Sequence, residues 1–132
     1  MQQNNFTLSI LTWYNKQKRI LPFRDIDDPY KIWLSEVMLQ QTQIETVIPY
    51  FQKWISKYPT IRSVAAADQR LLLKLWEGLG YYSRCRNFHK ATKIVVEKYG
   101  GAIPDKWLEF RALPGVGDYT AAAVLSIAYN QP

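Results

Sequence analysis

The chain has 132 residues, of which 48% are hydrophobic and five are tryptophan; this suffices for one folded domain, is too short for two, and excludes a disordered tail. Lysine and arginine outnumber the acidic residues 17 to 11, giving a net charge of +6, a balance that suits a surface binding a polyanion. The single cysteine, Cys85, excludes an internal disulfide and any zinc or iron–sulfur centre held by thiolates of this chain alone.

An amphipathic helix is predicted from Phe6 to about Gln17, because four apolar side chains fall near one stripe: Phe6, Ile10, Trp13 and Tyr14. Such a stripe has to dock on another element. Pro22 breaks this helix, and Asp28 followed by Pro29 forms a good start for the next one, with an N-cap acceptor and proline at the first helical position.

The next helix is predicted from Tyr30 to about Gln41, and its apolar residues surround it almost completely, as in a buried helix. Glu36 lies in the middle of it, between Ile32 and Leu39 on its own face. A carboxylate is costly there while ionised, so we expect it to be neutral, paired or lining a cleft. A raised pKa would suit a general acid, whereas a buried glutamate paired with a basic side chain would be structural.

The polar run Gln40 to Gln43 follows where this helix should end. Amides can hydrogen-bond base edges or fill a gap in a base stack, but they are also ordinary residues at a helix end. Further along, Thr46 is expected to cap a helix that tolerates Pro49 in its first turn, and the segments up to Trp76 read as scaffold.

Two glycines then interrupt the helical pattern in Gly78-Leu79-Gly80, directly before two tyrosines. Aromatic rings beside Arg84 and Arg86 form a workable unit for stacking on bases and binding phosphate; the alternative is a helix end with one tyrosine packed inward. A helix is expected from Ser83 to Tyr99. Its His89 has no obvious catalytic or metal partner in the sequence.

The stretch LPGVGDYTAAAVLSIA at 113–128 is the most informative. Two glycines two apart permit a tight turn with positive φ, and the turn leads directly into a helix whose N-terminal N–H groups can bind a phosphate. A first helical arm is expected from about Asp105, as its cap, to Ala112. The alternative is an ordinary turn after a capped helix.

All predicted elements are helical and their connections are short, so we expect an all-α domain of seven or eight helices around one core. No segment has 18 consecutive apolar residues, and the first residues lack the features of a signal peptide. These features predict a soluble, cytoplasmic protein with no membrane contact.

Three motifs resemble the A/G-specific adenine DNA glycosylases of the helix-hairpin-helix superfamily: WLSEVMLQQTQ at 33–43, GLGYYSRCRNFHKA at 78–91 and LPGVGDYTAA at 113–122. The similarity runs from about Leu21 to the C-terminus. It implies one helical domain, with an N-terminal helix over 1–21 and a six-helix module over 22–132 that contains the helix-hairpin-helix at about 105–128. The family excises adenine mispaired with 8-oxoguanine or guanine by hydrolysis of the N-glycosidic bond, in base excision repair.

The resemblance also implies roles for individual residues. Glu36 matches the general acid that protonates the flipped adenine and then helps to position water. Gln41 resembles the wedge that enters the base stack, and Tyr81 the aromatic that stacks beside the oxidised guanine.

Phe23, Arg24 and Tyr119 align with the adenine pocket. The related endonuclease III branch has a Schiff-base lysine at the position of Tyr119, so tyrosine there implies a monofunctional glycosylase. Thymine-mismatch glycosylases can also have tyrosine at this position and remain an alternative. A non-catalytic helix-hairpin-helix module that only binds DNA is a further alternative from another class.

In the hairpin, the resemblance implies that backbone N–H groups near Gly115, Gly117 and Asp118 hold a DNA phosphate. It also implies a possible monovalent cation bound through the backbone carbonyls of Arg111, Leu113 and Val116. Asp118 departs from the basic residue common in the family, and a carboxylate facing phosphate would weaken binding unless it points away.

The family continues beyond this sequence into a loop with an aspartate, then four cysteines for a 4Fe-4S cluster, then a domain that senses 8-oxoguanine. We therefore expect a fragment that keeps the fold and has little or no activity, without the cluster. The implied partner is double-stranded DNA with an A:8-oxoguanine or A:G mispair, bound by a monomer in the cytoplasm at the nucleoid.

Overall fold

The computed structural model describes residues 28–130, and over this range its only regular elements are seven helices. They are α2 (Pro29–Leu39), α3 (Ile44–Lys57), α4 (Ile61–Ala65), α5 (Gln69–Trp76), α6 (Tyr82–Tyr99), α7 (Trp107–Arg111) and α8 (Asp118–Tyr129). The all-α prediction is confirmed. The helix expected at 6–17 and the candidate pocket residues Phe23 and Arg24 lie outside the described residues.

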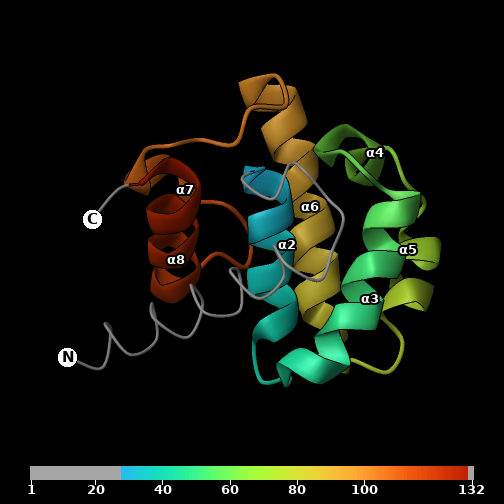
Figure 1. Ribbon diagram of the computed structural model, residues 1–132. Coiled ribbons are helices and arrows are strands. Elements are labelled where there is room, and N and C mark those ends of the chain that lie inside the picture. Colours follow the sequence, from blue (N-terminus) through green and yellow to red (C-terminus); the bar gives the residue numbers. More distant parts are fainter. Residues whose placement is uncertain (1–27, 131–132) are drawn as a thin grey trace.

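Helix α2 lies at the centre of the fold, with α7 and α8 on one side and α3 to α6 on the other (Figure 1). Asp28 caps it by accepting a hydrogen bond from the Tyr30 N–H at 2.9 Å, and Pro29 occupies its first turn. Nine of its eleven residues are buried. The structure therefore confirms the helix start at Asp28–Pro29 and the buried helix predicted from its apolar surround.

Large aromatic rings join the two sides of the core. The Trp33 ring meets the edges of Phe88 and Phe110, with centroids 4.8 and 5.2 Å away, and Trp54 packs against Trp76 at 5.9 Å. Edge-to-face pairs of this kind stabilise a core beyond the area that they bury. Helices from both ends of the described chain thus share one core.

Tyr30 fixes α2 against α3 by one buried and one partly buried hydrogen bond. Its hydroxyl donates to the Tyr58 carbonyl at 2.6 Å and accepts from Trp54 Nε1 at 2.9 Å. Burial raises the pKa of this phenol. Both polar groups of a buried tyrosine–tryptophan pair are satisfied, which holds the start of α2 in one place.

Two expected helix starts are wrong. Helix α3 begins at Ile44 after an extended Gln43, so Thr46 lies inside the first turn rather than at its cap, and Pro49 is an interior residue. Helix α7 is capped by Lys106 instead of Asp105. In neither helix does the side chain of the N-cap residue accept a hydrogen bond from a backbone N–H of the first turn. Packing of the apolar face therefore sets these boundaries in place of a local capping signal.

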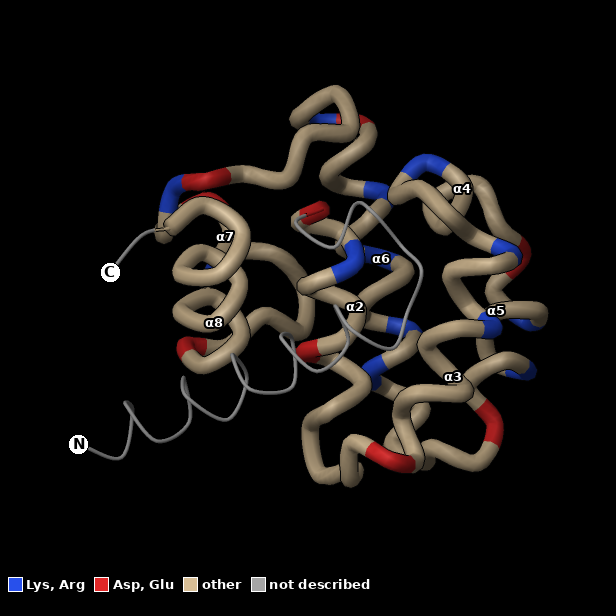
Figure 2. Tube along the Cα trace, in the orientation of Figure 1, with Lys and Arg blue, Asp and Glu red and all other residues tan. Residues whose placement is uncertain are grey.

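The charges are unevenly distributed over the fold. Lys and Arg lie mainly over α3 to α6, whereas α8 carries none (Figure 2). No helix among residues 28–130 is long and apolar enough to cross a membrane.

Candidate functional site

Glu36 is buried in the central helix with 2% of its surface exposed. Its Oε2 has no hydrogen-bond partner among the described residues. Burial raises the pKa of this carboxyl from 4.5 to about 8, because an ionised carboxylate loses its hydration in such surroundings. Glu36 is therefore a neutral acid at pH 7 with a proton to donate, as expected from its apolar neighbours.

Two adjacent glutamines end α2 in different ways. Gln40 is half-buried and its Nε2 donates to Thr120 Oγ1 in α8 at 2.9 Å. Gln41 is exposed and has a positive φ of 63°, which non-glycine residues rarely adopt. Gln40 thus holds the helix end in place, while Gln41 is presented to solvent.

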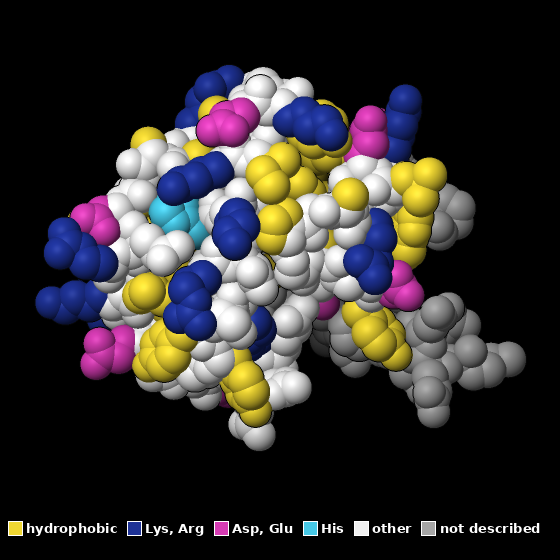
Figure 3. All heavy atoms as spheres, turned by 180° about the vertical axis from the view of Figure 1, so that it is seen from behind, with side chains coloured by type: hydrophobic (Ala, Val, Ile, Leu, Met, Phe, Trp, Pro, Cys, Tyr) yellow, Lys and Arg dark blue, Asp and Glu magenta, His cyan; other side chains and the backbone are white. Residues whose placement is uncertain are grey.

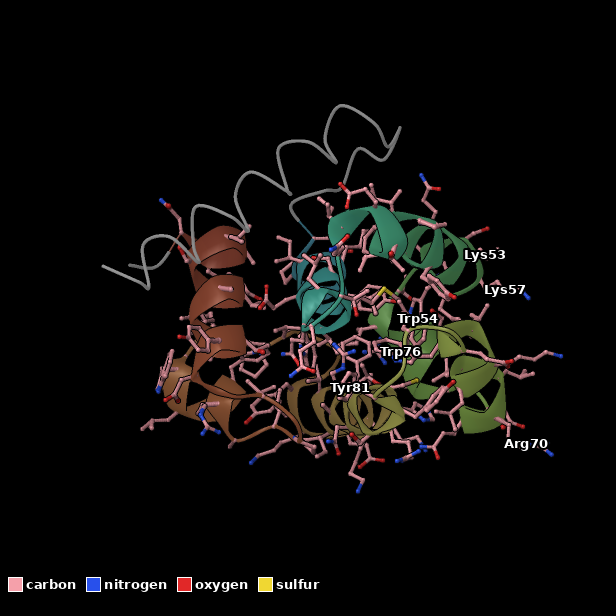
Figure 4. The ribbon with its side chains drawn as sticks, turned by 90° about the horizontal axis from the view of Figure 1, so that it is seen from below. Lys53, Trp54, Lys57, Arg70, Trp76 and Tyr81 are labelled. Carbon is pink, nitrogen blue, oxygen red and sulfur yellow. The ribbon has the colours of Figure 1, made fainter. Side chains whose placement is uncertain are left out.

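Tyr81 lies in the loop between α5 and α6, and it is 61% exposed with a φ of 50°. The turn before it is fixed by Trp76, whose Nε1 donates to the Gly80 carbonyl at 2.9 Å. Seen from below, Trp54 and Trp76 lie inside the fold, and Tyr81 lies near the first turn of α6 (Figure 4). A large aromatic ring on a fixed turn is suited to stacking on a base.

Arg84 joins these two segments, whereas the sequence predicts for it, with Arg86, a part in a unit that stacks on bases and binds phosphate. Its Nη1 donates to the carbonyls of Val37, at 2.8 Å, and of Gln40. Its Cζ lies 5.2 Å from the centre of the Tyr81 ring and 5.8 Å from that of Trp76. The contact with α2 spans more than forty residues of sequence, so no local signal could have revealed it.

The hairpin between α7 and α8 has the tight turn expected of two close glycines. Gly115 has a φ of 76°, and a Cβ on it would lie 2.8 Å from the Asn87 Cβ of α6. The Val116 N–H closes the turn on the Leu113 carbonyl at 3.1 Å. Gly117 precedes α8 without a side-chain cap, so the N-terminus of α8 is not closed by the hydroxyl or carboxylate that usually bonds the first N–H groups of a helix.

A salt bridge crosses this hairpin. Arg111 Nε lies 2.8 Å from Asp118 Oδ1, and Arg111 Nη1 donates to the Val116 carbonyl at 2.8 Å. Asp118 is thus paired with a side chain seven residues away. A monovalent cation on the carbonyls of Arg111, Leu113 and Val116 fits this arrangement poorly, because it would lie beside a guanidinium that already occupies one of them.

Tyr119 lies in the first turn of α8 and is 57% exposed. Its neighbour Thr120 is buried and accepts the hydrogen bond from Gln40. Thr120, which follows the hairpin turn, is therefore joined to the end of α2. This contact brings the hairpin motif and the glutamine motif together. The adenine-pocket roles predicted for Phe23 and Arg24 stay predictions.

Two further titratable groups, Cys85 and His89, lie on α6 and point into the core. Cys85 is buried, and burial raises the pKa of its thiol to about 12, so it is an inert core residue. His89 is buried, with its Nδ1 3.5 Å from Gln69 Nε2, and burial lowers its pKa. Several Lys and Arg side chains surround this histidine on the face seen from behind (Figure 3). Within residues 28–130, no three His, Cys, Asp or Glu side chains form a group that could hold a metal ion.

The sequence profile of the HhH-GPD superfamily base excision DNA repair proteins matches residues 34–131. Over 126 residues the chain is 44% identical to an adenine DNA glycosylase of Buchnera aphidicola (subsp. Baizongia pistaciae), with 95% of this chain and 36% of the relative aligned. It is 46% identical over 135 residues to the adenine DNA glycosylase of Homo sapiens, covering 96% of this chain and 25% of that protein. The chain thus spans about a quarter to a third of the length of these curated relatives.

Solved structures resemble this fold as well. A thermostable thymine-DNA glycosylase superposes with a TM-score of 0.76 at 29% identity, covering 98% of this chain and 60% of that chain. A trapped covalent complex of endonuclease III with DNA superposes with a TM-score of 0.75 at 24% identity, covering 96% and 62%. The tight hairpin and the buried acid on α2 belong to the part of the chain that the family profile spans. This chain belongs to the HhH-GPD superfamily of base excision DNA repair proteins.

Proposed function

We propose that this chain belongs to an adenine DNA glycosylase and carries the acid that protonates the base. The observation that carries the proposal is Glu36, a buried carboxyl whose pKa is raised to about 8. Two named relatives are adenine DNA glycosylases at 44% and 46% identity, which supports adenine as the base. The substrate would be adenine opposite 8-oxoguanine or guanine in double-stranded DNA.

In the proposed reaction, Glu36 gives its proton to a ring nitrogen of an adenine that has left the stack. The electron pair of the N-glycosidic bond then goes to the departing base. Water adds to the sugar carbon, and its proton returns to the Glu36 carboxylate, so the acid is regenerated. Tyr119 cannot form a Schiff base as lysine can, so we propose hydrolysis without strand cleavage.

We assign DNA contacts to three features. The N–H groups near Gly115, Gly117 and Asp118 would hold a phosphate at the start of α8, since an uncapped helix N-terminus attracts anions. Tyr81 would stack beside the modified guanine, and Gln41 would fill the gap left by the extruded base; both are exposed at left-handed turns. Tyr119 would line the adenine pocket. We infer a monomer that acts where DNA is found, in the cytoplasm at the nucleoid.

Thymine-mismatch excision is the second candidate, because the thymine-DNA glycosylase structure is 29% identical to this chain in sequence and superposes on nearly all of it. The iron–sulfur cluster implied for the longer family members would need four cysteines, and this sequence has one. We assign it no role in this chain.

The test is single-turnover base release with protein in excess, from duplexes carrying A:8-oxoguanine, A:G or T:G. We expect slow adenine release from the first two, absent in Glu36→Gln, with a rate that falls as pH rises past about 8, as the Glu36 pKa predicts. The human relative serves as a positive control for the duplexes. Thymine release from T:G alone would favour the second candidate. DNA binding with neither base released and no preference for 8-oxoguanine would favour a non-catalytic module.

A further inference from the structure

Arg84 contacts both segments to which DNA-stacking roles are assigned. It lies in the first turn of α6 and is partly buried. One side of its guanidinium bonds the end of α2, immediately before Gln41, and the Tyr81 ring lies 5.2 Å from its Cζ. The segments are forty residues apart in sequence, yet a single cation links them.

On the α2 side, Arg84 adds side-chain hydrogen bonds to a helix end where the Gln40 N–H already bonds the Val37 carbonyl. The last carbonyls of a helix have no intrahelical partner, and a cation there is favoured by the helix dipole. Nη1 donates to the carbonyls of Val37 and Gln40 together. The backbone is therefore held up to Gln40, and the left-handed turn at Gln41 starts from a fixed point.

On the other side, Arg84 supports the Tyr81 ring. The ring is mostly exposed, and the Gly80 carbonyl before it is held by Trp76. The guanidinium lies near both the Trp76 and the Tyr81 rings, where a cation is attracted to the π face. The direction of an otherwise exposed ring is thus restricted by a charge that is itself fixed to α2.

The guanidinium retains unused donors. Arg84 Nε and Nη2 are buried without a hydrogen-bond partner in the described part of the chain. Arg84 borders a cavity of about 50 Å³ between α2, α6 and the hairpin, together with Gln40, Asn87 and Gly115. This volume has room for a water molecule. The same side chain thus adjoins all three motifs without itself being exposed as a DNA ligand.

We propose that Arg84 is a positioning residue that sets Gln41 and Tyr81 relative to one another, so that both enter the duplex as one unit. The proposal rests on the DNA roles assigned above to these two residues. Lysine would keep the charge at this position, but it would lose the planar group that bonds two carbonyls while lying beside a ring.

The first experiment is independent of DNA. Side-chain order parameters of Gln41 and Tyr81 are measured by NMR relaxation in the free protein, in Arg84→Lys, and in Arg86→Lys, a matched change at an exposed arginine of the same helix. We expect both side chains to become more mobile in Arg84→Lys and to stay unchanged in Arg86→Lys. Unchanged order at both residues in Arg84→Lys overturns the proposal.

The second experiment is a double-mutant cycle on DNA affinity. We expect Arg84→Lys to reduce the preference for A:8-oxoguanine over A:T duplex at least fivefold, to leave affinity for the A:T duplex within twofold, and to add nothing in a Tyr81→Ala background. Equal weakening on both duplexes, or additive losses in the cycle, would show that Arg84 supports only the fold. If Tyr81→Ala itself leaves the preference unchanged, the assigned role of Tyr81 fails, and the NMR result still decides the linkage by Arg84.

Discussion

Gln40 donates a hydrogen bond from its Nε2 to Thr120 Oγ1 at 2.9 Å, which joins the end of α2 to the first turn of α8. The next residue, Gln41, has a left-handed backbone and an exposed side chain. The two side chains are identical in chemistry, and the turn of the chain after α2 places them in different surroundings. Gln40 therefore supports the fold, whereas Gln41 is free to contact a ligand.

We expect Thr120→Val to lower the free energy of unfolding by about 1 to 3 kcal/mol, because the Gln40 amide loses its acceptor in a partly buried position. Gln41→Ala should change it by less than about 0.5 kcal/mol, as at other exposed sites. Urea denaturation of both variants provides the measurement. A loss in Gln41→Ala as large as that in Thr120→Val would contradict the distinction between the two glutamines.

Glu36→Gln should make stability less dependent on pH. The folded carboxyl has its pKa raised to about 8 from 4.5, so the folded state binds the proton more tightly than the unfolded chain does. Stability is then fully present below about pH 4.5 and is lost as the pH rises toward 8. The variant cannot titrate at this position. The free energy of unfolding of Glu36→Gln, relative to that of the wild type, should therefore rise by more than about 1 kcal/mol between pH 5 and pH 8.

Thermal unfolding of both proteins across this pH range tests the prediction, and Glu97→Gln at an exposed position of α6 provides the matched control. A difference between wild type and Glu36→Gln that stays constant from pH 5 to 8 would mean that the carboxyl titrates normally in the folded protein.

Gly115→Ala should destabilise the protein by about 1 to 3 kcal/mol, because a left-handed backbone disfavours any Cβ. Moreover, that Cβ would lie 2.8 Å from the Asn87 Cβ. Gly117→Ala offers the matched control, since its φ is −97° and nothing lies within 4 Å of the added carbon. The measurement is the denaturant midpoint of unfolding of each variant. Equal losses in both variants would show that the turn does not depend on the conformation of Gly115.

The Arg111–Asp118 pair leads to a prediction about salts. The Arg111 guanidinium occupies the Val116 carbonyl, where a cation would bind. DNA affinity should therefore be the same within about twofold in potassium, sodium or tetramethylammonium chloride of equal ionic strength, because screening depends on ionic strength rather than on the ion. Arg111→Ala should weaken binding in all three, since it leaves Asp118 as an uncompensated charge beside the phosphate site. Fluorescence anisotropy of a labelled duplex measures this. An affinity that falls severalfold in tetramethylammonium would support the cation site implied by the family resemblance.

Local signals in the sequence predicted those features whose causes are local. Asp28 and Pro29 start α2 because the cap and the proline act within three residues, and the Gly115 turn follows from its own backbone freedom. The burial of Glu36 followed from apolar neighbours on the same helix. These features needed no knowledge of the rest of the chain.

Features that depend on distant contacts could not be predicted in this way. Arg84 bonds carbonyls 47 and 44 residues away, and the sequence around it indicates only a unit for stacking on bases and binding phosphate. Thr46 had the right chemistry for a cap, yet packing placed the helix start at Ile44. The compensation of Asp118 by Arg111 depends on the hairpin folding back over seven residues, which neither residue indicates alone.

The burial of α2 on all sides limits how the protein can adapt to a substrate. A helix with nine of eleven residues in the core moves only with the fold around it, because close-packed interiors yield little. A group carried by it, such as Glu36, has a nearly constant position. Under the proposed function, a molecule that is to react there must change its own shape to reach this group, so the distortion needed for recognition would fall on the DNA.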